Sequence, residues 1–319
     1  MKIEPIFIVG VPRSGTTLLR MMLNSHSKIA IAPETHFFRL FWVNRDKYGD
    51  LKKEENFKKL WNDLVRCKYF QDLKLKNTQK IYKSLLNHEQ RDYKNIFEKL
   101  CKEYAKQNNK LRWGEKTPGH LEYLEIILSF FPSAKIIHII RDPRDVALSY
   151  KKVPWGVNDV FSVARLWNRY MNIFKNFKNK NKSNFLEVKY EDLVIRPKDI
   201  LQTICAFIGE EFEEQMLSFH FYSKQYIEHN EPWKEGVLKP LTVSNVGKHK
   251  KELSKWEIEQ IETKCWKHML DKDYTLLFLN PFSYFDLTYK KIIFHSLWFF
   301  RAIFRKANII RSQLSGNRN

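Results

Sequence analysis

An arginine, a serine and two threonines stand together near the start of the chain, in the stretch Arg13-Ser14-Gly15-Thr16-Thr17. They follow a short apolar run, residues 5–10, which predicts a buried strand that ends at a glycine. Residues 14–23 then carry apolar side chains at helical spacing, which predicts an amphipathic helix. A strand, a glycine-bounded turn and a helix N-terminus direct backbone N–H groups toward one point, so this stretch is predicted to bind an anion.

The spacing of Gly10 and Gly15 is that of a nucleotide-binding P-loop, but Thr16 stands where such a loop has its lysine. The P-loop lysine and a magnesium ion together neutralise the outer phosphates of a nucleoside triphosphate. Here Arg13 offers a planar fork of donors, and Thr16 and Thr17 add hydroxyl groups. This set suits a less charged group that is bound without a metal ion, and the sequence carries no cluster with metal-ligand spacing.

A second polar group follows a β-branched run, Lys135–Ile140, which predicts a central strand of a parallel sheet. Arg141 comes directly after this run, and Asp142 with Pro143 predicts the start of a helix. Ser149 lies eight residues beyond Arg141. Because ligands bind at the carboxyl ends of parallel strands, Arg141 and Ser149 are candidates for holding a second anionic group.

These two motifs, in this order and about one α/β half-domain apart, resemble those of the sulfotransferases that use 3′-phosphoadenylyl sulfate (PAPS). Residues 12–17 are similar to the 5′-phosphosulfate loop of that family, and the strand ending in Arg141 is similar to its 3′-phosphate motif. The resemblance implies a P-loop-like fold, PAPS as donor and 3′-phosphoadenosine 5′-phosphate (PAP) as product. It also implies these nucleotide-binding residues: Arg13, Ser14, Gly15, Thr16, Thr17, Arg141 and Ser149.

Sulfuryl transfer needs a base that takes the proton of the acceptor. Glu34 is the predicted base, because it follows a short predicted strand near the loop and a glutamate before a threonine has this role in the tyrosylprotein branch of the resembled family. That branch has an arginine two residues later, where this sequence has His36, and this departure weighs against a peptide tyrosine as acceptor. His120 is the rival base, since Lys116 and His120 resemble a lysine–histidine pair of the cytosolic sulfotransferases; the other interpretation is a helix-start histidine bonded to the backbone.

Lys116 resembles the lysine of the family that bridges the donor and the transferring sulfuryl group. A lysine there neutralises charge on the bridging oxygen as the bond breaks, so Arg13, Glu34 and Lys116 are the predicted catalytic residues. Two matches are weaker. Tyr190 resembles a tyrosine that lies against the nucleotide, and Lys248 resembles a basic residue of a late loop that closes on its phosphates. His138, inside a buried run, is predicted to be a core residue.

Strands alternate with helices along the chain, which predicts a three-layer α/β/α fold with a central parallel sheet. Residues 37–111 are mostly helical and aromatic-rich and are predicted to form a helical insertion within a single domain, residues 1–280. Residues 219–251 are polar and irregular, which indicates a loop that closes over a nucleotide. The remaining predicted elements are strands at 28–32 and 185–190 and helices at 121–131, 160–178, 197–208 and 255–270.

The formal net charge of +20 predicts anionic partners, such as nucleotide phosphates or acidic glycans. Many lysines lie in mixed surface runs and no basic stripe with interleaved aromatic residues is present, so nucleic acid is not a predicted partner. The four cysteines are scattered without a C-x-x-C pair, which predicts a reducing compartment. The first strand begins almost at Met1 and leaves no room for a signal peptide, so the prediction is a cytoplasmic protein.

Residues 281–319 are predicted to form a separate basic tail with an amphipathic helix over residues 287–311. Apolar side chains such as Ile292, Phe299 and Ile303 share one face, and lysines and arginines share the other, so the helix is too interrupted by charge to span a bilayer. Two interpretations stay open. The helix lies on an anionic membrane surface, which would make the protein peripheral at the inner membrane, or it packs on its own domain or on the partner subunit of a homodimer.

The sequence therefore predicts a PAPS-dependent sulfotransferase that acts on a hydroxyl or amine of a carbohydrate, glycolipid or small metabolite. One alternative is a tyrosylprotein-type sulfotransferase. A second is a kinase-like P-loop enzyme, which Thr16 and the Arg141–Ser149 pair disfavour. A third is a non-catalytic protein that binds anions or a membrane surface on the same fold, and the intact set of Arg13, Glu34, Lys116 and Arg141 argues against it.

Overall fold

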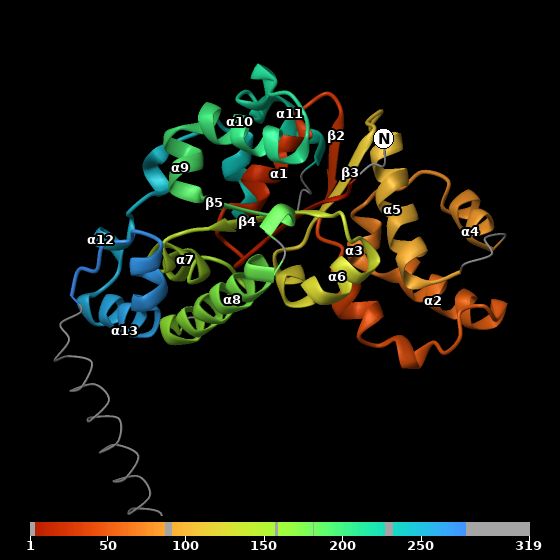
Figure 1. Cartoon of the computed structure of the whole chain (residues 1–319), viewed down its shortest axis with the longest axis horizontal. Helices are drawn as coiled ribbons and strands as arrows, with labels where there is room; N and C mark the ends of the chain where they lie inside the picture. Colours follow the sequence, from red (N-terminus) through yellow and green to blue (C-terminus); the bar gives the residue numbers. More distant parts are fainter. Residues whose placement is uncertain (1–3, 87–90, 157–158, 181, 227–231, 279–319) are drawn as a thin grey trace, which may run out of the picture. The chain divides into compact units, whose positions relative to one another are not determined.

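A five-stranded parallel sheet, in the order β2-β3-β1-β4-β5, is the centre of the first of two units, residues 1–253 and 254–319. The computed structural model describes residues 4–86, 91–156, 159–180, 182–226 and 232–278 (Figure 1). The strands are β1 (Ile6–Gly10), β2 (Ile29–Ala32), β3 (Arg112–Lys116), β4 (Lys135–Ile140) and β5 (Phe185–Lys189). The prediction of a mixed α/β fold with a parallel sheet is confirmed.

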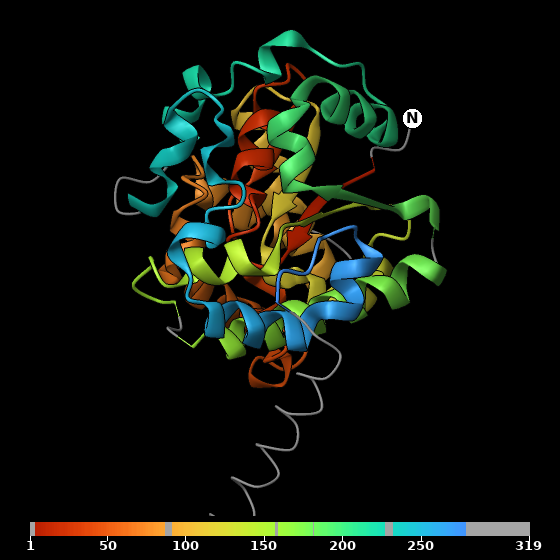
Figure 2. The same cartoon turned by 90° about the vertical axis from the view of Figure 1, so that its left-hand side faces the viewer.

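Helices cover both faces of this sheet, because its strands carry apolar residues on both sides. Both views place α1 on one side and α8 on the other (Figures 1 and 2). On the α1 side lie α1 (Thr16–Asn24), α9 (Tyr190–Ile195), α10 (Pro197–Ile208) and α11 (His220–Ser223). On the other side lie α5 (Tyr93–Gln107), α6 (Leu124–Phe130), α7 (Pro143–Tyr150) and α8 (Val160–Lys180).

The two faces bury different kinds of side chain. Towards α1 and α10 the strands direct aliphatic residues, among them Ile8 and Ile137. On the opposite face, Phe7 stacks on Phe97 of α5 at 5.9 Å between ring centroids and lies edge-on to Trp113 of β3 at 6.3 Å. Each such buried ring stabilises the fold by about 1.5–3 kcal/mol. The sheet is therefore fixed from both sides, and its strand ends are held in place.

Strand order determines where a ligand can bind. β1 lies between β3 and β4, so the chain that leaves β1 turns to one side of it and the chain that enters β4 returns on the other. In open α/β sheets the crevice at such a reversal, outside the carboxyl ends of the strands, is the binding position. Here that crevice is bordered by the segment after Gly10 and the segment after Ile140.

Between β2 and β3 the chain is mostly helical, within the residues predicted as an insertion. It contains a π-helical turn η1 (Phe38–Trp42), a short 3₁₀ turn η2 (Arg45–Lys47), α2 (Glu54–Arg66), α3 (Lys68–Gln71), α4 (Thr78–Leu86) and α5. Aromatic contacts join these helices, as where Phe57 of α2 stacks on Tyr82 of α4 at 5.3 Å. These helices occupy one side of the unit, beside β2 and β3 (Figure 1).

Short helical turns make up much of the rest of the first unit, and many of them connect the longer elements. They are η3 (Pro118–Tyr123), η4 (Lys182–Asn184), η5 (Glu214–Met216), η6 (Lys224–Tyr226), η7 (Pro232–Leu238), η8 (Val243–Asn245) and α12 (His249–Glu252). The helix predicted from Leu121 instead begins at Leu124, because η3 forms a tighter turn that starts at Pro118. The irregular segment predicted at 219–251 is built largely from such turns.

The second unit contains α13 (Lys255–Asp271), which begins with a capping box between Ser254 and Glu257. The buried carboxylate of Glu262 accepts hydrogen bonds from the backbone N–H groups of Leu277 (2.8 Å) and Phe278 (3.0 Å). The predicted tail, residues 281–319, lies outside the described residues. Among the helices that the structure describes, none combines the length and the apolar character needed to cross a membrane.

A substitution at Gly10 would test how closely β1 approaches β4. Its φ is +154°, and a Cβ at this position would lie 2.4 Å from the carbonyl oxygen of Ile139. We expect Gly10→Ala to lower the free energy of unfolding by about 2–3 kcal/mol, measured by urea denaturation. The control is Gly209→Ala, where φ is +75° but no atom lies within 4 Å, and about 1 kcal/mol is expected. Equal losses in the two variants would contradict the packing described.

Candidate active site

The segment between β1 and α1 forms an open anion site. Arg13 has a left-handed φ of 73° and Gly15 a φ of 96°, and Ser14 N–H donates to the carbonyl of Val11 at 3.1 Å. The N-cap residue of α1 is Gly15, which has no side chain to cap the helix, and the N-terminus of a helix is a favourable position for an anion. A Cβ on Gly15 would lie 2.4 Å from the ring of Tyr190, so glycine is needed for this close approach.

Hydrogen bonds to two distant segments hold Arg13 at the rim of the site. Its Nε donates to Ser149 Oγ at 3.1 Å, and its Nη2 donates to the carbonyl oxygen of Trp233 at 3.3 Å. Neither partner is a carboxylate, so these contacts do not neutralise the guanidinium charge. Ser149 was expected beside Arg141; the structure bonds it to Arg13, and all three residues border one pocket.

Arg141 links three segments at the end of β4. Its Nη1 donates to the carbonyl of Arg13 at 3.1 Å, and its Nη2 donates to the carbonyl of Asn245 at 2.6 Å. The guanidinium lies 4.5 Å from the centre of the Tyr190 ring, which fixes its plane by a cation–π contact. The Nε of Arg141 is buried without a hydrogen-bond partner in the described part of the chain. A ligand oxygen is the kind of group that would satisfy it.

Asp145 fixes the loop that carries Lys248. Its carboxylate accepts hydrogen bonds from the backbone N–H of Gly247 (2.7 Å), the backbone N–H of His249 (2.9 Å) and Nδ1 of His249 (2.9 Å). Burial would raise the pKa of Asp145, but the hydrogen bonds from His249 and the nearby Arg141 outweigh burial and hold it below its ordinary value. Lys248, between the two anchored residues, reaches the pocket.

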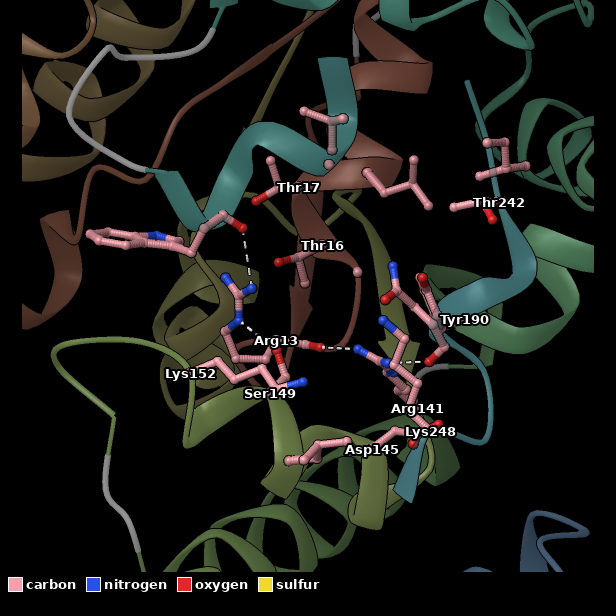
Figure 3. Close-up of a pocket in the computed structure, with 18 of the residues that line it drawn as sticks. Arg13, Thr16, Thr17, Arg141, Asp145, Ser149, Lys152, Tyr190, Thr242 and Lys248 are labelled. Carbon is pink, nitrogen blue, oxygen red and sulfur yellow. Dashed lines mark hydrogen bonds between the residues drawn. The ribbon is translucent and has the colours of Figure 1, made fainter. Parts of the chain in front are cut away.

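These side chains line a pocket of about 370 Å³. In Figure 3, Arg13, Ser149 and Lys152 lie on one side, Arg141, Tyr190 and Lys248 lie on the other, and Thr16 and Thr17 lie between them. Its charged lining consists of Arg13, Arg141, Lys152 and Lys248 against Asp145, whose carboxylate is already bonded to His249. The excess of cations favours an anionic ligand.

Glu34 and Lys116 are next to this pocket without lining it. Lys116 Nζ lies 2.5 Å from Glu34 Oε1 and 3.5 Å from the hydroxyl of Thr17, which does line it. His36 Nε2 lies 3.3 Å from Glu34 Oε2. The side chain of Lys116 is 1% exposed and that of Glu34 is 26% exposed, so Glu34 is the more accessible of the two. The structure thus brings together an acid–base group, a buried ammonium and the anion loop.

Three further residues that the sequence analysis considered, Ser14, His120 and His138, are buried. Ser14 is fully buried, and its hydroxyl has no hydrogen-bond partner among the described residues. The His120 side chain is 1% exposed, with Nδ1 2.8 Å from Glu115 Oε2 and Nε2 without a hydrogen-bond partner in the described part of the chain. His138 is buried in β4, stacks on Phe174 at 4.0 Å and lies 3.3 Å from Glu187, which agrees with its predicted place in the core.

Several pocket residues were not predicted, among them Asp145, Lys152, Trp233, Thr242 and Asn245. The last three belong to the polar segment, residues 219–251, that the sequence predicts to close over a nucleotide, but the sequence does not indicate which of its residues line the pocket. Asp145 and Lys152 lie four and eleven residues after Arg141, and helical spacing from that arginine was the available signal. In the described part of the chain, no group of His, Cys, Asp and Glu side chains is arranged to hold a metal ion.

A family model and two sequence relatives each match about two thirds of this chain. A family model described as "Sulfotransferase family" matches residues 5–214 of this chain. An uncharacterized protein of Aquifex aeolicus (strain VF5) is 25% identical over 229 residues, which are 68% of this chain and 27% of that protein. Protein-tyrosine sulfotransferase A of Caenorhabditis elegans is 27% identical over 220 residues, which are 66% of this chain and 51% of that protein. The match thus spans about a quarter and about half of the length of these two relatives.

A solved structure shares the fold. The sulfotransferase domain from the curacin biosynthetic pathway superposes with a TM-score of 0.62 at 20% identity, over 86% of this chain and 99% of that domain. The superposition supports the arrangement of the central sheet and its helices.

Asp145 gives a pH-dependent test of the loop anchor. We expect Asp145→Asn to lower the free energy of unfolding by about 2–4 kcal/mol at pH 7, because an amide cannot accept all three hydrogen bonds. Since the folded-state pKa lies below the ordinary 3.8, the wild-type advantage is present above that pH and is lost as the pH falls through the folded-state pKa. Urea denaturation at several pH values measures it. A gap that stays constant down to pH 2 would contradict this role, and the exposed Asp199→Asn is the control.

Proposed function

Since the chain belongs to the sulfotransferase family, we propose that it transfers the sulfuryl group of PAPS to a hydroxyl or amine of an acceptor. The observation that carries the proposal is the cationic pocket beside the Glu34–Lys116 pair. PAPS has two anionic ends, the 5′-phosphosulfate and the 3′-phosphate. The pocket has a cation group on each side, which supports a ligand with this charge distribution.

The anion loop is the proposed site of the 5′-phosphosulfate. The start of α1, with Gly15, Thr16 and Thr17, and the side chain of Arg13 line the same pocket. On the other side, Arg141, Tyr190 and Lys248 would hold the 3′-phosphate and the nucleoside. Ser149, which the sequence assigned to the 3′-phosphate, is bonded to Arg13 and would act through that residue.

The chemical step would use groups already in contact. Bound PAPS supplies an activated sulfuryl group on a phosphate leaving group. Glu34 would take the proton of the acceptor hydroxyl as its oxygen bonds to sulfur. Lys116, within reach of Thr17 on the loop, would neutralise the charge that develops on the bridging oxygen as the sulfur–oxygen bond breaks. The products are the sulfated acceptor, PAP and one proton.

Exposure favours Glu34 over His120 as the base. An acceptor must reach the base within hydrogen-bond distance, and the Glu34 side chain is 26% exposed. The His120 ring is 1% exposed and is enclosed by Glu115 and Phe38, whose ring centroid lies 4.9 Å away. A buried imidazole fixed by a carboxylate is suited to holding structure.

For the acceptor we propose a hydroxyl of a carbohydrate, a glycolipid or a small metabolite. A relative named as a protein-tyrosine sulfotransferase makes a tyrosine peptide the alternative, and His36, which stands where that branch has an arginine, weighs against it. His36 contacts Glu34 and packs on Tyr69 of α3 at 4.3 Å, so the helical insertion borders the proposed acceptor side. The cytoplasmic location, the homodimer and membrane contact through residues 287–311 stay predictions.

Transfer of radiolabelled sulfate from PAPS tests the proposal. The purified chain is incubated with labelled PAPS and with oligosaccharides, a glycolipid, simple alcohols, an amine and a tyrosine peptide. We expect one class of hydroxyl acceptor to become labelled. Label on the tyrosine peptide alone would support the tyrosylprotein alternative, and phosphate transfer from ATP in parallel reactions would support a kinase-like enzyme.

The identity of the base is tested by two amide substitutions. We expect Glu34→Gln to lower the single-turnover rate of transfer by about 10²–10⁴-fold while the affinity for PAP changes less than about threefold, because the amide keeps its shape but cannot take a proton. His120→Gln retains an N–H donor for Glu115 and should lose less than about tenfold. The reverse order of the two losses would identify His120 as the base.

A further inference from the structure

A carboxylate that the proposed reaction does not use lies directly behind the Glu34–Lys116 pair. Glu115, on β3, is 0% exposed and does not line the pocket. A buried carboxylate costs several kcal/mol unless hydrogen bonds and a positive partner compensate. The groups that donate hydrogen bonds to Glu115 therefore identify the segments that this carboxylate anchors.

Its hydrogen-bond donors come from three short segments. Oε1 accepts from the backbone N–H of Thr35 (3.0 Å), from the hydroxyl of Thr35 (3.0 Å) and from the hydroxyl of Thr117. Oε2 is 2.8 Å from Nδ1 of His120. Burial would raise the pKa of Glu115, but His120, Thr117 and Thr35 together outweigh burial and hold it below its ordinary value. The carboxylate therefore remains charged and keeps these donors around it.

Two of these segments carry the proposed catalytic groups. Thr35 directly follows Glu34, and Thr117 directly follows Lys116. The strands align accordingly, because Ala32 at the end of β2 is paired with Glu115 on β3. The Glu115 carboxylate thus anchors the residue that follows each member of the Glu34–Lys116 pair.

The backbone after Glu34 also needs an anchor. His36 has a left-handed φ of 48°, a conformation that costs about 1–2 kcal/mol in a residue other than glycine. The Thr117 hydroxyl, itself bonded to Glu115, accepts from the N–H of Thr35 (3.1 Å) and from the N–H of His36 (3.3 Å). This turn brings His36 Nε2 to 3.3 Å from Glu34 Oε2. The Glu34 carboxylate thus lies between Lys116 and His36, and the hydrogen bonds of Glu115 and Thr117 fix the chain beside both of these residues.

We propose that Glu115 is a positioning residue that sets the geometry of Glu34 against Lys116, through Thr35 and Thr117, with His120 as its counter-group. The inference rests on the proposed function, because the pair must be catalytic for its geometry to matter. It assigns His120 to the support of the site and gives the Trp113-Gly114-Glu115-Lys116-Thr117 stretch two functions on adjacent residues, one chemical and one structural.

A double-mutant cycle tests the inference. We expect Glu115→Gln to lower kcat by about 100-fold, as for a misplacement of about 1 Å, with the KM for PAPS and the affinity for PAP changed less than about threefold. In a Glu34→Gln background the same substitution should lose less than about tenfold, because Lys116 is then the only member of the pair left to position. Equal fold-losses in both backgrounds would mean a merely structural role and would overturn the inference.

The matched control is Glu187→Gln. Glu187 is a carboxylate on β5 that lies 3.3 Å from Nδ1 of the buried His138, so it is the same kind of pair on neighbouring strands away from Glu34. We expect this variant to keep kcat within about threefold. A loss as large as that of Glu115→Gln would show that any glutamate of the sheet that contacts a buried histidine has the same effect, and would overturn the inference.

A second pair of variants covers the case in which Glu115→Gln does not fold. Thr117→Val removes the bridging hydroxyl in nearly the same shape, and Thr117→Ser keeps it. We expect Thr117→Val to lower kcat by about tenfold and to speed hydrogen exchange of the Thr35 and His36 amides, and Thr117→Ser to do neither. Equal behaviour of the two variants would contradict the network. If the wild-type chain transfers no sulfate, the proposed function fails, whereas the exchange measurement still reports on the anchor.

Discussion

The position of β1 between β3 and β4 is the constraint on which the rest of the first unit depends. Parallel strands that end at one edge bring together segments that are distant in sequence, and here the segments that follow Gly10, Lys116 and Ile140 meet there. The close contact of Gly10 with β4 and of Gly15 with Tyr190 shows how little space separates them. Every proposed catalytic or binding residue from Arg13 to Tyr190 ends a strand at this edge, follows one or lies in the first helix after one.

Charge organises what the strands bring together. The guanidinium of Arg141 is bonded to two backbone carbonyls from the first loop and from the 240s segment, so one cation ties together both walls of the pocket. Its hydrogen bonds go to carbonyl dipoles, and the nearby carboxylate of Asp145 is bonded to His249, so the cations of the pocket outnumber its acidic groups and favour an anionic ligand. Behind the pocket the organising charge is negative. There the buried carboxylate of Glu115 collects donors and holds the backbone next to Glu34 and Lys116.

Local patterns predicted much of this arrangement. β4 could be predicted because four of the six residues of Lys135–Ile140 are isoleucine. The end of α10 could be predicted from Gly209, which has the left-handed φ of 75° typical of a glycine at a helix C-terminus. The loop at Arg13 was predictable from its residue types and spacing. The contacts of Arg13 with Ser149 and Trp233 were not, since they join residues 136 and 220 positions apart and Trp233 belongs to a segment without sequence periodicity. Nor was the Glu115–Thr35 anchor, which exists only once β2 and β3 align in their observed register.

The central claim is that the pocket binds a 3′-phosphorylated adenine nucleotide and not a triphosphate. Calorimetric titration with PAP, and separately with ATP and magnesium, tests this claim most directly. The proteins to titrate are the wild-type chain, Lys248→Ala and the control Lys250→Ala. Lys250 is an exposed lysine of the same segment that does not line the pocket. The account predicts binding of PAP, a Kd about tenfold higher in Lys248→Ala, no change in Lys250→Ala and no binding of ATP. Preference for ATP with magnesium, or no binding of either nucleotide, would contradict it.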